Sequence, residues 1–122
     1  MDTPHILDLE QDSWQPHPTV AGVLTKTIES RMTHPYADAL LAKVIVGGEI
    51  PWHVHETASK TAYILQGTGT LLFAETAMHE APSEATLKPG VALTIPGGWW
   101  HSVVNTGDEP LILFAFHTPP TL

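Results

Sequence analysis

The sequence predicts an all-β fold. Short runs of β-branched and other apolar residues recur along the chain, and glycine- and proline-containing turns separate them. No segment shows the clear 3.6-residue period of an amphipathic helix. Short strands at this spacing are typical of a β-sandwich or a β-barrel.

The strands are expected after an extended arm. Pro4, Pro16 and Pro18 disfavour a helix within residues 1–20, because proline fixes φ and lacks an amide hydrogen. Residues 21–122 are expected to form a single domain. Its strands are predicted at 23–29, 41–46, 52–55, 61–65, 70–74, 91–95, 101–104 and 111–117. Segments 37–41 and 76–84 each have room for one helical turn.

Composition narrows the classes of partner. The 122 residues carry 13 Asp+Glu against 5 Lys+Arg, a formal net charge of −8, which opposes binding to nucleic acid and to anionic membranes. The chain has no cysteine, so any metal must be held by His, Asp or Glu. Its N-terminus shows no basic segment followed by an apolar run, and we therefore expect a cytoplasmic protein.

Two histidines stand in a pattern that suits a metal ion. His53 and His55 flank Val54, and residues two apart on a strand point to the same face. Imidazole nitrogens bind zinc, iron, nickel, copper and manganese. An HxH pair is equally compatible with two ordinary histidines, so the assignment needs a third ligand.

A second pattern supplies that ligand and indicates a family. Gly90, Pro96, Gly98, His101 and Asn105 have the spacing of the second motif of the cupin superfamily. The sequence therefore resembles the small single-domain, RmlC-like cupins. The resemblance implies a double-stranded β-helix, which is a jelly-roll barrel with a metal site at its mouth.

The first cupin motif is present with one substitution. Gly47, His53, His55 and Gly67 occupy its positions, and Lys60 stands where the family has glutamate. The resemblance implies His53, His55 and His101 as ligands of a divalent metal ion, with Fe, Mn, Zn, Ni and Co as the candidates. Lys60 would be repelled by that ion, so it is expected to lose its proton, to turn away, or to mark a cupin without metal.

Three residues are candidates for proton transfer beside the metal. Lys60 can act as a base or as a Schiff-base amine, or it can simply pair with Glu49 or Glu75. Glu56 can replace the missing carboxylate ligand if the strand ends at His55. His117 can be a fourth ligand, a proton carrier or a rim histidine.

Aromatic residues cluster around the same motifs. Trp52, Tyr63, Trp99 and Trp100 are expected to wall an apolar ligand pocket, or alternatively to cover a turn or a dimer contact. The extended arm, which carries Trp14, resembles the arms that small cupins exchange in homodimers.

The resemblance leaves the reaction open, because cupins include enzymes and binding proteins. The favoured hypothesis is a metal-dependent enzyme, a dioxygenase or a lyase/isomerase, that acts on a small anionic or aromatic compound. Three neutral histidines would leave open positions on the metal for paired substrate oxygens. The alternative is a small-ligand-binding or sensing module that does not require a metal. Lys60 supports this alternative, and the complete histidine trio opposes it.

Overall fold

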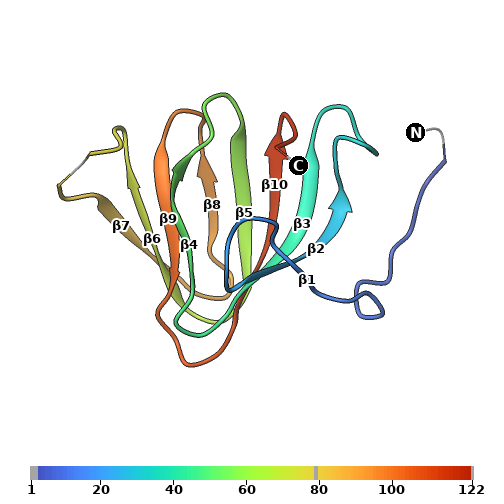
Figure 1. Ribbon diagram of the computed structural model, residues 1–122, viewed down its shortest axis with the longest axis horizontal. Helices are drawn as coiled ribbons and strands as arrows, with labels where there is room; N and C mark the ends of the chain where they lie inside the picture. The colour runs from blue at the N-terminus through green and yellow to red at the C-terminus, as the bar shows by residue number, and fades with distance from the viewer. Residues whose placement is uncertain (1–2, 79, 122) are drawn as a thin grey trace.

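The protein consists of antiparallel strands. A computed structural model describes residues 3–78 and 80–121, and within these ranges it contains no helix (Figure 1). The strands are β1 (Gln15–Pro16), β2 (Val23–Glu29), β3 (Asp38–Val44), β4 (Glu49–Val54), β5 (Ser59–Gln66), β6 (Gly69–Ala74), β7 (Ser83–Leu87), β8 (Ala92–Ile95), β9 (Trp100–Asn105) and β10 (Leu111–Thr118).

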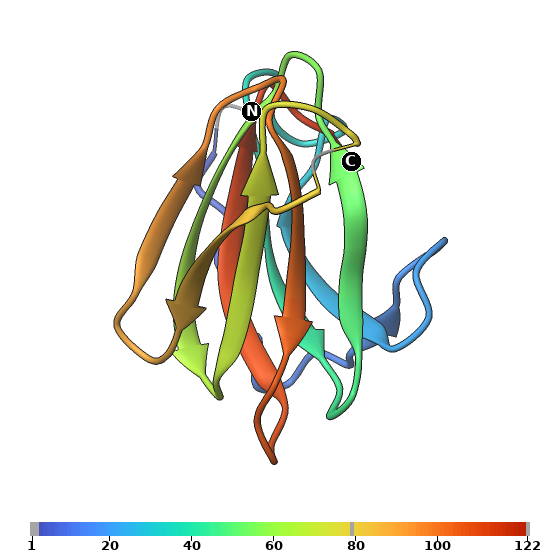
Figure 2. The same ribbon diagram turned by 90° about the vertical axis from the view of Figure 1, so that its left-hand side faces the viewer.

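The strands form two sheets that face each other. The larger sheet has the order β1-β2-β3-β10-β5-β8, and the smaller one has the order β4-β9-β6-β7. Figure 2 shows the smaller sheet in front of the larger one. This arrangement confirms the predicted all-β, double-stranded β-helix fold.

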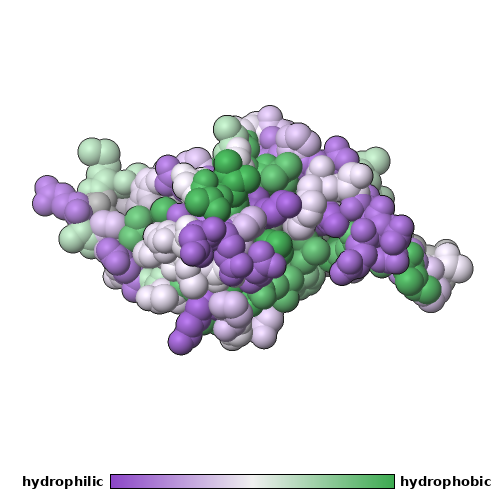
Figure 3. All heavy atoms as spheres, turned by 90° about the horizontal axis from the view of Figure 1, so that it is seen from below, coloured by the Kyte–Doolittle hydropathy of each residue, from purple (hydrophilic) through white to green (hydrophobic). Residues whose placement is uncertain are grey.

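The core lies between the sheets because the strands alternate inward and outward residues. On β3, Leu40, Ala42 and Val44 are buried, and the residues between them are half-buried. On β10, Leu113 and Ala115 follow the same alternation and pack in the same cluster. Seen from below, apolar side chains gather near the middle of the surface and hydrophilic ones surround them (Figure 3).

Three local expectations differ from the structure. Segment 37–41 is not helical: from Asp38 onward it belongs to β3, which pairs with both β2 and β10. Segment 76–84 forms turns and the start of β7 in its described part, and residue 79 lies outside the described residues. Strands β1 and β7 were not expected, because Pro16 and the polar residues of 83–86 weaken the strand signal.

Asn105 of the second motif has a structural role at the end of β9. Its side-chain nitrogen Nδ2 donates hydrogen bonds to the carbonyls of Val44, Ile45 and Glu109 at 2.9 to 3.1 Å. Its Oδ1 accepts a bond from the amide of Gly107 at 2.9 Å. Asn105 therefore connects the turn after β9 to the end of β3, which lies 61 residues earlier in the sequence at Val44.

The N-terminal arm packs against its own chain. Gln15 and Pro16 of β1 pair with Thr25 and Leu24 of β2. The ring of Trp14 lies under the ammonium groups of Lys26 and Lys43, at 4.9 and 4.6 Å from the ring centroid. Within the described ranges, no helix is long and apolar enough to cross a membrane.

Candidate metal centre

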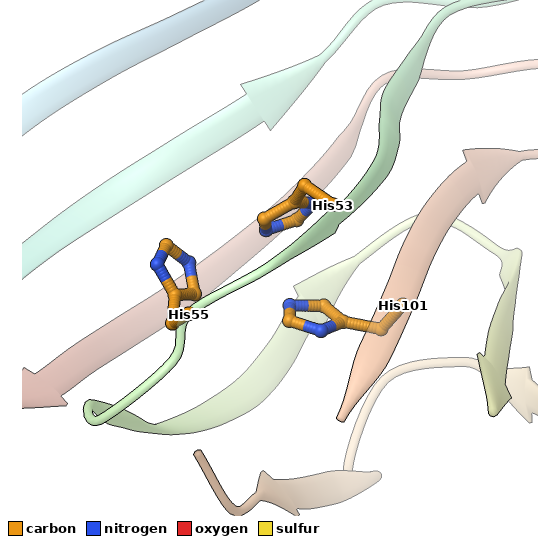
Figure 4. A group of neighbouring side chains, drawn as sticks. All are labelled: His53, His55 and His101. Carbon is orange, nitrogen blue, oxygen red and sulfur yellow. The ribbon is translucent and has the colours of Figure 1, made fainter. Parts of the chain in front are cut away.

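The topology brings the histidines of both motifs together. His53 lies near the end of β4, His55 follows that strand, and His101 lies at the start of β9. Since β4 and β9 are antiparallel, His53 and His101 are directly opposite each other in the ladder. Each ring offers one nitrogen to a common space, and these three nitrogens lie within 4.8 Å of one another. Figure 4 shows the three rings turned toward that space.

Backbone carbonyls fix the orientation of two of the rings. Nδ1 of His53 lies 2.7 Å from the carbonyl oxygen of Pro51, and Nδ1 of His101 lies 3.1 Å from that of Trp99. A carbonyl only accepts, so each Nδ1 carries the proton and each Nε2 is left with a free lone pair. Metal-binding histidines are commonly held in this way.

One of these free nitrogens has no partner. His101 is almost fully buried, and its Nε2 makes no hydrogen bond within the described part of the chain. A buried polar atom without a partner costs free energy unless a ligand satisfies it. Since this atom faces two further imidazoles, the donor set fits a divalent metal ion.

Electrostatics keep the trio neutral and able to coordinate. Burial, together with the positive charges of His53 and Lys60, lowers the pKa of His101 to about 3. Burial also lowers the pKa of His55 to about 4, together with its histidine and lysine neighbours. The pKa of His53 is likewise lowered, mainly by burial. At neutral pH all three imidazoles therefore present lone pairs rather than protons.

Lys60 points into the same interior. It lies on β5, is only 5% exposed, and lines a cavity with His53, His55 and His117. Burial lowers its pKa to about 8, so the amine still carries its proton in most molecules at pH 7. Of the three expectations for this position, turning away from the site is wrong. Lys60 is buried rather than at the rim, and no ion pair joins it to Glu49 or Glu75.

His117 and Asp38 form a buried pair beside the trio. Nδ1 of His117 lies 2.7 Å from Oδ1 of Asp38, its neighbour in the β3–β10 ladder. The ring of His117 also meets that of His55, with centroids 5.1 Å apart. Burial lowers the pKa of His117, although its hydrogen bond to Asp38 acts in the opposite direction. Sequence reasoning missed Asp38, which is fully buried.

The cavity extends from this polar end between the sheets. Its volume is about 670 Å³, within the usual range for small-ligand sites. The polar end holds His53, His55, Lys60 and His117. Most of the remaining wall is apolar and includes Val20, Val23, Leu40, Ala42, Leu113 and Ala115. Residues 15–20 of the arm form one side of the cavity.

The four aromatic residues lie outside this cavity. Tyr63 is half exposed on β5, and Trp52 stacks on Trp100 with ring centroids 6.3 Å apart. Trp99 packs against Phe73 beside a second, smaller pocket. Because neighbouring strand residues face opposite ways, the inward histidines of β4 and β9 place the adjacent tryptophans on the other face.

Glu56 also lies away from the trio. It is exposed in the turn between β4 and β5, and no carboxylate joins the histidine group among the described residues.

Comparison with known proteins agrees with this geometry. A family model described as "Cupin domain" matches residues 40–117, which include both motifs. The auxin-binding protein ABP19b of Prunus persica is 36% identical over 75 residues, covering 62% of this chain and 35% of that protein. The chain spans between about a third and a half of the length of the first curated relatives it matches.

Solved structures share the fold across nearly the whole chain. A protein described as a predicted oxalate decarboxylase from Thermotoga maritima superposes with a TM-score of 0.79 at 20% identity, covering 94% of this chain and 99% of that one. The polyketide cyclase RemF of Streptomyces resistomycificus gives a TM-score of 0.77 at 16% identity, with coverage of 95% and 80%. At these identities, the likeness shows the fold alone.

Proposed function

Because the chain belongs to the cupin family, we propose that it is a metal-dependent enzyme that acts on a small molecule bound between its sheets. The observation that carries this proposal is the buried, unpartnered Nε2 of His101, which faces two other imidazoles. The hydrogen bonds of His53 and His101 to carbonyls hold free nitrogens toward one point before any metal arrives. Such preorganisation favours a built metal site over three incidental histidines.

His53, His55 and His101 would hold the ion, with Fe, Mn, Zn, Ni and Co as the candidates. A bound divalent ion would act as a Lewis acid toward substrate oxygens, and iron would also permit oxygen chemistry. Three neutral histidines leave the charge of the ion uncompensated. This arrangement therefore favours a substrate with anionic oxygen atoms.

His117 supports proton transfer in the same cavity. If its Nδ1 donates to Asp38, its Nε2 is free to accept a proton from a substrate in the cavity. The Asp38 carboxylate would then stabilise the imidazolium that forms. A base held in this way favours a lyase or isomerase over a dioxygenase, since both of the former reactions move protons.

The names of the compared proteins are compatible with this class. One is described as a predicted oxalate decarboxylase, another as a polyketide cyclase, and a third as an auxin-binding protein. The first two names describe enzymes acting on small molecules. The third name supports the second candidate, a binding module, which Lys60 also favours because its buried positive charge can hold an anion without a metal.

Metal content tests the proposal. Elemental mass spectrometry on untagged protein should find about one ion per chain, and His101→Ala should lose it. His34→Ala is the matched control for nonspecific binding, because His34 is a half-buried histidine that belongs neither to the trio nor to the cavity wall. The proposal fails if wild-type protein stays free of metal after reconstitution with Fe, Mn, Zn, Ni and Co in turn. The binding module would then be the better account.

A further inference from the structure

The cavity contains a buried cation that no protein group neutralises. Lys60 is 5% exposed, and within the described part of the chain its ammonium group has no hydrogen-bond or ion-pair partner. A buried charge without a partner is unfavourable in the empty protein. A protein can retain such a destabilising charge at a site where a bound ligand of opposite charge compensates it.

The nearby buried carboxylate, Asp38, already has hydrogen-bond partners of its own. Oδ1 of Asp38 contacts Nδ1 of His117, and Oδ2 accepts hydrogen bonds from the amide and hydroxyl groups of Thr121 at 2.6 and 3.0 Å. Asp38 is therefore committed to holding His117 and the C-terminal segment in place. An anion that compensates Lys60 has to come from outside the chain.

The rest of the cavity restricts what that anion can be attached to. Beyond Lys60 and the histidines, the wall is more apolar than polar: Leu40, Ala42 and Leu113 are among its aliphatic residues, and its other polar side chains carry no charge. A highly charged ligand such as a sugar phosphate would lose hydration against the aliphatic side chains, and the uncharged hydroxyl groups of Thr25, Thr27 and Ser30 would not neutralise its second negative charge. An apolar chain or ring would fit it and gain from burial.

From these contacts we infer that the cavity binds a small monocarboxylic acid with an apolar body, and that Lys60 binds its carboxylate. The carboxylate lies at the end that holds Lys60 and His117, and the apolar body lies along Leu40, Ala42 and Leu113. This inference deepens the proposed function by naming the substrate class, and it rests on that function only for the chemistry that follows binding. The lysine at the usual glutamate position thus selects the ligand instead of holding the metal.

Binding of a model acid to metal-free protein tests the inference. Isothermal titration calorimetry at pH 7 would compare octanoate with octanamide, which has the same apolar body and no charge. We expect octanoate to bind about tenfold to a hundredfold more tightly, the usual range for a hydrogen bond to a charged group. Lys60→Met should remove that preference, and Lys88→Met should keep it because Lys88 is exposed.

The outcomes separate this inference from the metal-dependent function. Equal affinity of the wild type for acid and amide, binding of neither, or a preference that survives in Lys60→Met would overturn it. A preference for octanoate in a protein that binds no metal would leave it standing while the metal-dependent function fails. The comparison of acid with amide on the wild type requires no variant, so equal affinity there would overturn the inference even if Lys60→Met does not fold; Lys60→Gln is then the second variant that tests the role of the lysine.

Discussion

Lys60 destabilises the folded protein, and the effect depends on pH. Burial lowers its pKa from 10.5 to about 8, so the folded state binds this proton less tightly than the unfolded state does. Below pH 8, burial of the charged Lys60 lowers the free energy of unfolding by about 3 kcal/mol. This effect disappears as the pH rises from 8 toward 10.5. Lys60→Met should therefore stabilise the metal-free protein at pH 7 by up to about 3 kcal/mol, with little gain near pH 10.5.

Urea unfolding of both proteins at several pH values measures this difference. Lys88→Met should change stability by no more than about 0.5 kcal/mol, as exposed substitutions usually do. A gain for Lys60→Met that stays constant from pH 7 to pH 10.5 would show that Lys60 is not a strained buried cation.

At the scale of single residues, the sequence predicted the metal-ligand candidates but not the side chains that lie around them. Motif spacing alone identified His53, His55 and His101, which the structure brings together. The inward direction of Lys60 and the outward direction of Tyr63 follow from alternation along one strand, a signal that was present and unused. Asp38 meets His117 across 79 positions of sequence, and no local pattern predicts such a pairing.

At the scale of elements, two motif glycines with similar backbone angles should differ in their tolerance of substitution. Gly67 and Gly90 have φ values of +84° and +94°, which L-residues rarely adopt. A Cβ on Gly67 would lie 2.5 Å from the carbonyl oxygen of Pro110, whereas one on Gly90 would meet nothing within 4 Å. Gly90→Ala should cost about 1 to 2 kcal/mol from backbone strain alone. Gly67→Ala should cost about 1 to 3 kcal/mol more, because the turn must shift.

Thermal and denaturant unfolding of the two alanine variants would measure the difference. Equal losses of stability would mean that the approach of Gly67 to Pro110 is not needed for folding. Gly67 would then be required only for its positive φ.

The strands themselves were largely predictable: six of the eight expected segments agree with the structure within about two residues at each end, and β3 and β4 each begin three residues earlier than expected. The errors in the strand prediction have a common physical reason: a short segment becomes a strand through partners that are distant in the sequence. Segment 37–41 has no internal signal for its partners, and pairing with β2 and β10 makes it a strand. Strand β1 exists through its pairing with β2, which the proline content of the arm concealed.

At the scale of the whole molecule, the arm completes the cavity, and residues 15–20 belong to its wall. The sequence suggested instead that the arm is exchanged between two chains. In the structure, β1 pairs with β2 of the same chain. Whichever chain supplies the arm also supplies part of the ligand site, so the oligomeric arrangement bears on function.

We predict that the protein is a homodimer in solution. Tyr63 and Leu65 are each almost half exposed on the outer side of β5, and half-buried Phe114 lies beside Tyr63 in the ladder. A second copy would cover this apolar surface. Light scattering should give twice the 13.2 kDa of one chain, and Leu65→Lys should give monomers that keep the same circular dichroism spectrum. A wild-type mass of one chain would contradict the prediction.

A disulfide can show which chain supplies the arm in such a dimer. Gln15 and Thr25 are directly opposite each other in the β1–β2 ladder and both line the cavity, so their side chains share a face. The natural chain has no cysteine, so Gln15→Cys/Thr25→Cys introduces a single possible pair per arm. We expect the oxidised variant to run as one chain on a denaturing, non-reducing gel, because β1 pairs within its own chain. A covalent dimer would show that the arms are exchanged, and each cavity would then be closed by residues of both chains.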